Sequence, residues 1–317
     1  MSATTSEPAP PAPVDGDPAP APPRASQRRR HERTLGLRLS APAFFVMVFV
    51  TAYPIGYAVV LSLYQYRLTD PDGRRFIGLS NYATVLTDPI WWSAVLTTAI
   101  ITLASVAIEL VLGFGFAWVM FRILRGRSII RTAILVPYGI ITVVSAFIWR
   151  YAFQLDSGFV NQWFGLDGFN WFGERWSSLM VITLSEIWKT TPFISLLLLA
   201  GLVQVSDEML EAARVDGANG WQRLWKVVIP NMKAAIMVAV LFRTLDAWRI
   251  FDNPFIMTSG ANGTETLSIL TYRQNVTLVN LGAGSAVSVL LFASVVLIAV
   301  IFVKGFRTDL SQVRGDS

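Results

Sequence analysis

The stretch LSAPAFFVMVFVTAYPIGYAVVLSLYQY, residues 39–66, decides the class of fold. It contains no Asp, Glu, Lys or Arg. A helix needs about 20 mostly apolar residues to cross a bilayer, and this stretch is longer than that. Residues 39–66 therefore predict a transmembrane helix.

The composition of the chain supports a membrane protein. Of its 317 residues, 53% are hydrophobic and 15% are charged, whereas about 25% are charged in a typical soluble domain. There is no cysteine, and the only histidine, His31, lies in a basic run that we interpret as solvated. Disulfides, thiolate metal sites and Cys/His catalysis are thereby excluded. The net charge of +5 comes from short basic clusters between apolar runs, which indicate membrane topology and not nucleic-acid binding.

Five more apolar runs are long enough to cross the membrane. The sequence therefore predicts an all-α membrane protein with six transmembrane helices, and both termini on the same side. Residues 1–34 are rich in Pro and Ala without apolar periodicity, so we expect a disordered tail there. A transmembrane domain is expected over 35–307, with helices at about 39–66, 91–121, 132–149, 179–205, 234–258 and 281–303.

The loop charges predict the orientation of these helices. Seventeen Lys and Arg residues fall in the N-terminal tail, the 122–131 and 214–233 loops and the C-terminal end, against six in the other loops. The side richer in Lys and Arg is normally cytoplasmic. We therefore expect a multi-pass protein of the cell membrane, in contact with lipid, with both termini and the tail at 308–317 in the cytoplasm. The loop at 163–176 would be external, and its aromatic residues fit either an interfacial belt or a docking surface.

A loop between the fourth and fifth predicted helices, residues 205–231, has the pattern of two short helices. Its core reads DEMLEAARVDGANGWQRLWKVVIP, residues 207–230. The first part is rich in helix formers, Gly217 and Gly220 permit a sharp turn, and a second helix can run until Pro230 breaks it. Such a pair of helices outside the bilayer can dock into a groove on a partner protein.

This loop resembles the EAA loop of ABC importer permeases. The family pattern is EAA, three residues, G, nine residues, I, one residue and LP; here Val227 stands for I and Ile229-Pro230 for LP. The resemblance implies that the loop couples the permease to a separate ATPase through six residues: Glu211, Ala212, Ala213, Asp216, Gly217 and Ala218. No GxxxxGK[ST] phosphate loop occurs in this chain, so we expect no cofactor on it, and ATP and Mg²⁺ on the partner ATPase.

Further residues resemble the maltose-type subunit of carbohydrate importers. They are Trp188, Pro192, Phe251-Asp252 and the stretches 258–260 and 264–267. The resemblance implies a type I importer permease fold and no enzymatic activity. It also implies three kinds of partner: a homologous second permease, two ATPase subunits and an extracytoplasmic sugar-binding lipoprotein. The expected substrate is a disaccharide. Trehalose is the first guess, because the Pro/Ala-rich tail looks actinobacterial, and maltose is the second.

Charged residues inside the predicted helices need an explanation, since each costs about 2.5–3.5 kcal/mol or more at the bilayer centre. They could form internal salt bridges or face a water-filled cavity. Glu186, Lys189, Thr190 and Phe193 share one helix face, which suits a sugar's hydroxyls and C–H groups. By resemblance, the predicted substrate pathway consists of Glu186, Lys189, Thr190, Phe193, Arg243, Ala247 and Ile250, and the other intramembrane charges are Glu109, Asp246, Arg249 and Asp252.

Two alternatives remain open from the sequence. Lys189 and Arg243 would suit an anionic solute, as in an ABC permease for a polyol phosphate or another polar solute. Buried carboxylates would also suit a proton-coupled secondary transporter, although the EAA-like loop would then be unexplained. The run Gly113-Phe114-Gly115 inside the second predicted helix indicates close helix packing and not a nucleotide site.

Overall fold

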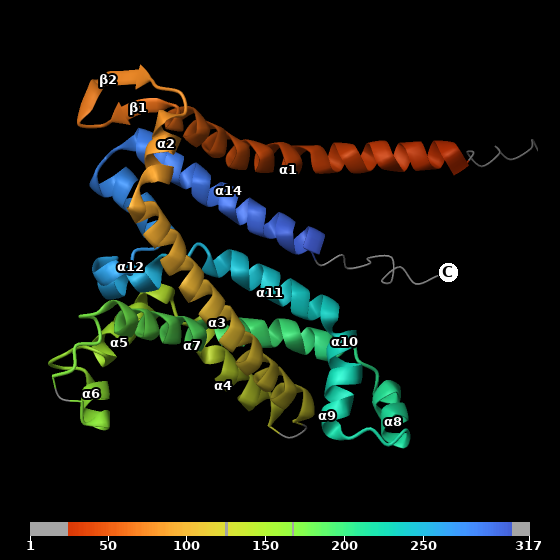
Figure 1. The fold of residues 1–317 in the computed structure, drawn as a ribbon. Coiled ribbons are helices and arrows are strands. Elements are labelled where there is room, and N and C mark those ends of the chain that lie inside the picture. Colours follow the sequence, from red (N-terminus) through yellow and green to blue (C-terminus); the bar gives the residue numbers. More distant parts are fainter. Residues whose placement is uncertain (1–24, 124–125, 167, 306–317) are drawn as a thin grey trace, which may run out of the picture. The chain divides into compact units, whose positions relative to one another are not determined.

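The computed structural model describes residues 25–123, 126–166 and 168–305, and most of them are helical. The chain divides into two compact units, residues 1–54 and 55–317, which are described separately. The predicted tail at 308–317 and residues 1–24 of the predicted N-terminal tail lie outside the described residues. Figure 1 shows the elements with their labels.

The described part of the first unit is the beginning of one long helix, α1 (Ala25–Ser62). The predicted disordered tail extended to residue 34, so its last ten residues, 25–34, are helical instead. These residues follow Pro23, the last of the clustered prolines, and consist mostly of good helix formers such as Ala, Arg, Gln and Glu. Large apolar side chains of this helix are exposed, among them Phe45 and Phe49. Such side chains suit a lipid or protein neighbour.

The prediction that the fold is purely helical is wrong at one point. Strand β1 (Tyr64–Arg67) pairs antiparallel with β2 (Asp70–Phe76), with Tyr64 opposite Phe76. Helix α1 therefore ends at Ser62 and not near residue 66. Asn81 of α2 (Ser80–Thr87) donates hydrogen bonds to the carbonyl groups of Ser62 (2.8 Å) and Tyr64 (2.9 Å), and these bonds satisfy backbone acceptors where the helix stops.

The centre of the second unit is a pair of long apolar helices, α3 (Pro89–Arg122) and α7 (Arg175–Leu202). Asp88 caps α3 by accepting from the backbone N–H of Ile90 at 2.8 Å. A Cβ atom added at Gly113 would lie 2.7 Å from Ile194 of α7, which confirms close helix packing at this glycine. Gly115 has open space around it.

Two of the predicted helices are broken. The span predicted at 132–149 consists of α4 (Arg127–Gly139) and α5 (Thr142–Ala152), which meet at 87°. Pro137 and Gly139 weaken the helix just before extended backbone at Ile140. The span predicted at 234–258 consists of α11 (Lys233–Ala247) and α12 (Asp252–Thr258), separated by residues 248–251.

The remaining elements lie mostly between and after these helices. In Figure 1, α8 to α10 lie at one end of the second unit, and the hairpin and α6 lie toward the other. By length and composition, the described residues contain four helices that could cross a membrane. The number rises to as many as six if two bent pairs each count as one span, 128–139 with 142–152 and 220–231 with 233–258. The other elements are α6 (Phe159–Phe164), α8 (Asp207–Val215), α9 (Gly220–Arg223), η1 (Leu224–Val228), α10 (Ile229–Asn231), η2 (Ala261–Gly263), α13 (Leu267–Tyr272), η3 (Arg273–Thr277) and α14 (Leu281–Gly305).

Candidate functional site

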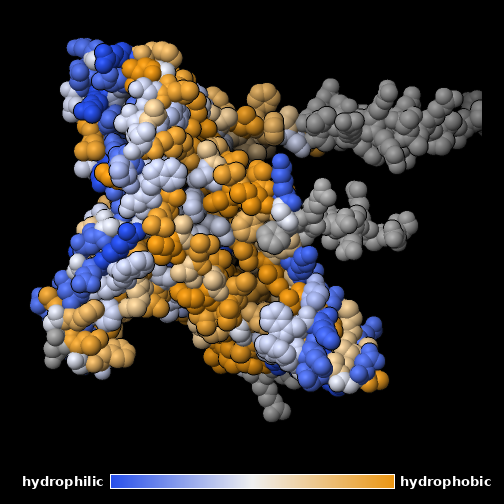
Figure 2. Space-filling view, in the orientation of Figure 1, coloured by the Kyte–Doolittle hydropathy of each residue, from blue (hydrophilic) through white to orange (hydrophobic). Residues whose placement is uncertain are grey.

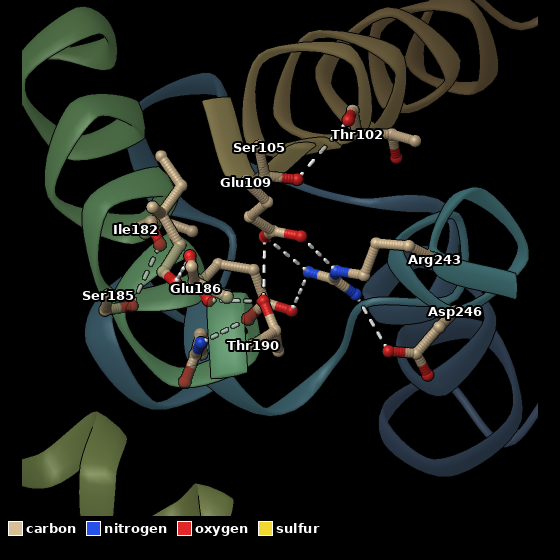
Figure 3. Close-up of polar contacts among 12 residues, drawn as sticks. Thr102, Ser105, Glu109, Ile182, Ser185, Glu186, Thr190, Arg243 and Asp246 are labelled. Atoms are coloured by element: carbon tan, nitrogen blue, oxygen red, sulfur yellow. Dashed lines mark hydrogen bonds and ion pairs between the residues drawn. The ribbon is translucent and has the colours of Figure 1, made fainter. Parts of the chain in front are cut away.

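A buried cluster of charges joins α3, α7 and α11 (Figure 3). Its centre is Arg243, whose side chain is fully buried. The guanidinium donates to Glu109 from Nε (2.6 Å) and Nη2 (3.1 Å), to Glu186 from Nη2 (2.7 Å), and to Asp246 from Nη1 (2.8 Å). One cation thus holds three carboxylates, of which Glu109 is fully buried, Glu186 is nearly so and Asp246 is 66% exposed.

The cluster also reaches the break between α11 and α12. Asn253, in the first turn of α12, is buried and donates to Glu186 at 2.5 Å. The hydroxyl of Thr190 donates to Glu109 at 2.7 Å. The side-chain oxygen of Asn253 is buried and has no hydrogen-bond partner among the described residues. Glu186 therefore accepts hydrogen bonds from both sides of the break, from Arg243 of α11 and from Asn253 of α12.

The predicted polar stripe on α7 divides between two neighbours. Glu186 and Thr190 belong to the Arg243 cluster, whereas Lys189 donates to the carbonyl oxygen of Ile140 at the α4–α5 break. The ring of Phe193 stacks on Tyr138 near the same break, with centroids 5.6 Å apart. One face of α7 thus contacts both the α4–α5 break and the residues beside the α11–α12 break.

The other predicted intramembrane residues lie around this cluster. Ala247 is fully buried and Ile250 nearly so, next to the break. Arg249 is exposed and Asp252 half-buried, and neither forms an ion pair among the described residues. Glu109 forms an ion pair inside the subunit, which is the first of the two arrangements left open for the intramembrane charges. Asn253 was not predicted from the sequence. The available signal was its position directly after the Phe251-Asp252 pair, which resembles the maltose-type subunit.

The loop at 205–231 has the predicted pair of short helices. Ser206 caps α8, and Gly217 takes a φ of +83°, a conformation that favours glycine. Asn219 and Gln222 form a reciprocal capping box that starts α9. Pro230 lies in α10, which ends one residue later at Asn231, close to the predicted break. The chain bends by 69° only after Asn231.

The predicted coupling residues lie on the surface of this loop. Glu211, Ala212, Asp216 and Gly217 are exposed, and Ala213 and Ala218 are half-buried. Large apolar side chains beside them are also exposed: Val215 at 88% and Trp221 at 68%. The other face of the loop packs through Leu210 and Leu224 on the core formed by α3 and α7. The loop thus packs on the core through one face and exposes apolar side chains on another.

The aromatic stretch at 163–176 divides into two parts. Trp171 and Phe172 pack on the core, and the indole N–H of Trp171 donates to Asn161 at 2.6 Å. Trp163, Phe164 and Trp176 are strongly exposed. An interfacial belt and a docking surface both remain predictions for these exposed rings.

Comparison with known proteins identifies the family. Residues 109–311 match the model of binding-protein-dependent transport system inner membrane components. The chain belongs to this family. It is 50% identical, over 88% of this chain and 90% of the relative, to the trehalose transport system permease protein SugA of Mycobacterium tuberculosis. It is 33% identical, over 90% and 98%, to the trehalose/maltose transport system permease protein MalF of Thermococcus litoralis.

A solved structure supports the fold. The chain matches a subunit of a bacterial alginate ABC transporter, crystallised with an alginate-pentasaccharide-bound periplasmic protein, with a TM-score of 0.75. The sequences are 17% identical, and the match covers 88% of this chain and 96% of that one. The predicted resemblance to permeases of carbohydrate ABC importers is confirmed. The chain is a multi-pass inner-membrane transport component and not an enzyme, which excludes the secondary-transporter alternative.

Proposed function

We propose that this permease subunit serves the import of trehalose. The observation that carries the proposal is the 50% identity to SugA over 88% of the chain. Maltose is the second candidate, because the more distant relative from Thermococcus litoralis has both sugars in its name. A polyol phosphate or another polar solute is the remaining alternative.

Uptake measurements test the substrate. A strain lacking this permease is complemented with the intact gene and supplied with radiolabelled trehalose, with unlabelled trehalose, maltose or a polyol phosphate as competitors. We expect uptake that requires the gene and that trehalose inhibits most strongly. Gene-dependent uptake that maltose or the polyol phosphate inhibits better than trehalose would contradict the proposal.

We propose six membrane spans, with α4 and α5 counted as one span, α11 and α12 as another, and both termini in the cytoplasm. The excess of Lys and Arg in the 122–131 and 214–233 loops supports this orientation. The chain has no cysteine, so single cysteines can report topology without a background. A cysteine at Asp216 should react with an impermeant maleimide only after the cells are opened, and one at Asp72 in intact cells. The reverse pattern would invert the topology.

We propose that the 205–231 loop docks on an ATPase subunit that carries the ATP and Mg²⁺. The exposed residues Glu211, Ala212, Asp216 and Gly217 form the contact together with the half-buried Ala213 and Ala218. The exposed Val215 and Trp221 add apolar surface. The full assembly contains a second permease, two ATPases and an extracytoplasmic sugar-binding lipoprotein. The permease domain extends over 35–307.

Variants at exposed positions of the loop test this docking. Gly217→Pro cannot adopt the φ of +83°, because the proline ring fixes φ near −65°. We expect this variant and Glu211→Ala to reach the membrane but to lose both ATPase co-purification and uptake. Glu208→Ala, which removes an exposed carboxylate from the same helix, is the matched control and should keep both. Full uptake in Gly217→Pro and Glu211→Ala would refute the coupling role.

We propose that the substrate pathway follows α7 and the break in α11–α12. The predicted residues Glu186, Lys189, Thr190, Phe193, Arg243, Ala247 and Ile250 all lie along this line. Arg243 and Ala247 are fully buried, so their part is to position Glu186 and the break, and not to touch sugar. We expect Thr190→Val to lower the maximal uptake rate while the complex still assembles. Unchanged uptake would remove Thr190 from the pathway.

A further inference from the structure

A polar pocket lies between the C-terminal end of α3 and the 205–231 loop, away from the Arg243 cluster. Its volume is about 440 Å³, within the range of about 300–1,000 Å³ of ligand sites. Three arginines line it, Arg122 from α3 and Arg214 and Arg223 from the loop, together with two carboxylates, Asp207 and Glu211. The pocket therefore carries an excess of positive charge.

The arginines have unused hydrogen-bonding capacity. Among the described residues, none of the three forms an ion pair with a carboxylate. The Nε atom of Arg223 is buried and has no hydrogen-bond partner in the described part of the chain. The guanidinium of Arg122 stacks over the ring of Trp118, with its central carbon 4.9 Å from the ring centroid, which leaves its N–H groups available at the edge. Guanidinium groups in this arrangement suit a phosphate.

The position of the pocket indicates that this phosphate belongs to a lipid. Leu112, Phe116 and Val119 are exposed on α3 and lie at helical spacing on the face that ends at Arg122. Helix α3 is apolar enough to cross the membrane. Figure 2 shows the hydrophilic α8–α9 region beside apolar surface. Acyl chains can follow the apolar face of α3, and a headgroup then reaches the arginines at the membrane surface.

We propose that this pocket binds the headgroup of an anionic phospholipid, with Arg122 and Arg223 donating to its phosphate oxygens. The lipid bridges the end of a membrane helix and the 205–231 loop, and so fixes the loop relative to the bilayer. Basic pockets of this kind at the cytoplasmic ends of membrane helices recognise anionic headgroups. The inference goes beyond sugar transport, and it rests on the proposed orientation, which places this end of α3 on the cytoplasmic side.

Native mass spectrometry of the purified transporter complex tests the proposal. The complex is titrated with phosphatidylglycerol or phosphatidylcholine of identical acyl chains. We expect preferential binding of phosphatidylglycerol, and a loss of about five-fold in its affinity for each of Arg122→Gln and Arg223→Gln. Arg223→Lys, which keeps the charge, should retain the preference for the anionic lipid. Arg67→Gln removes an exposed arginine from the hairpin and should bind like the unmodified protein.

Three results would overturn the proposal. Equal binding of the two lipids would show that the headgroup charge is not recognised. Equal losses in Arg67→Gln and Arg223→Gln would show a general charge effect. Displacement of the lipid by millimolar inorganic phosphate would identify a soluble anion as the ligand. Size-exclusion profiles show which variants are folded before the comparison.

Discussion

The substitution Arg243→Met should strongly destabilise the permease. Arg243 is the only cation that contacts Glu109 and Glu186 among the described residues, and both carboxylates are buried. Methionine approximately keeps the length of the side chain but removes the charge and all the donors. The two carboxylates would then share a buried, uncompensated site.

The expected loss follows from the geometry of the cluster. Removing one partner of a buried ion pair costs about 3–5 kcal/mol. Arg243 makes two hydrogen bonds to Glu109 and one to Glu186, so the upper half of that range applies, and protonation of a carboxylate limits it. The bond to Asp246 adds little, because that side chain is 66% exposed and water can replace the contact.

Thermal unfolding of the detergent-purified complex measures this loss. In domains of 150–250 residues, 1 kcal/mol lowers the melting temperature by roughly 2–4 °C, so a fall on the order of 10 °C is expected. Arg249→Met is the matched control, because Arg249 is exposed and its Nε contacts only the carbonyl oxygen of Leu245 at 3.1 Å. Its melting temperature should stay within a few degrees of the unmodified value.

A double substitution identifies the cause. In Glu109→Gln/Arg243→Met, one of the two uncompensated charges is also removed, so part of the lost stability should return. A melting temperature of Arg243→Met equal to that of Arg249→Met would refute the reasoning. A double variant that is less stable than the sum of the two single losses would refute the pairing with Glu109.

Three other predictions use the same melting assay. Gly113→Val should cost about 1–3 kcal/mol, because its side chain would collide with Ile194, whereas Gly115→Val, in open space, should cost less; equal losses would contradict the packing. Asn81→Ala should cost about 1–3 kcal/mol, because two backbone carbonyls lose their donor. Lys189→Met should cost a similar amount, because the carbonyl oxygen of Ile140 at the α4–α5 break loses its donor. An unchanged melting temperature would show that this hydrogen bond is dispensable.

The loop at 205–231 could be predicted in detail because its structure is set by local sequence. Gly217 adopts the left-handed conformation that the turn requires, and Asn219 with Gln222 supplies a capping box within three residues. The positions of α3, α7 and α14 were also predictable within a few residues, since apolar length alone indicates a span. Both features depend on neighbours in the sequence.

The broken helices could not be predicted in the same way. The apolar stretch around Ile140 continues through its break, and residues 248–251 contain only one charged residue, Arg249, so hydropathy predicts unbroken spans there. The breaks are stable because side chains from other helices support the freed backbone, as Lys189 does at Ile140 and Thr266 does by donating to Ile250 at 3.1 Å. Such irregular backbone is tolerated at membrane depth only where protein surrounds it. The sequence shows which side chains can donate hydrogen bonds, but not which backbone carbonyl groups accept them.

The pairing of charges has the same limit, and the consequence is functional. Sequence analysis left salt bridges and a hydrated cavity open for Glu186, and the structure joins it to Arg243, 57 residues away. Glu186 and Lys189 are one helical turn apart on α7, yet they support different breaks. A shift of α7 must therefore move both broken spans together or separate Glu186 and Lys189 from them. On the proposed substrate pathway, these two contacts link residues expected to meet sugar to the breaks in both spans.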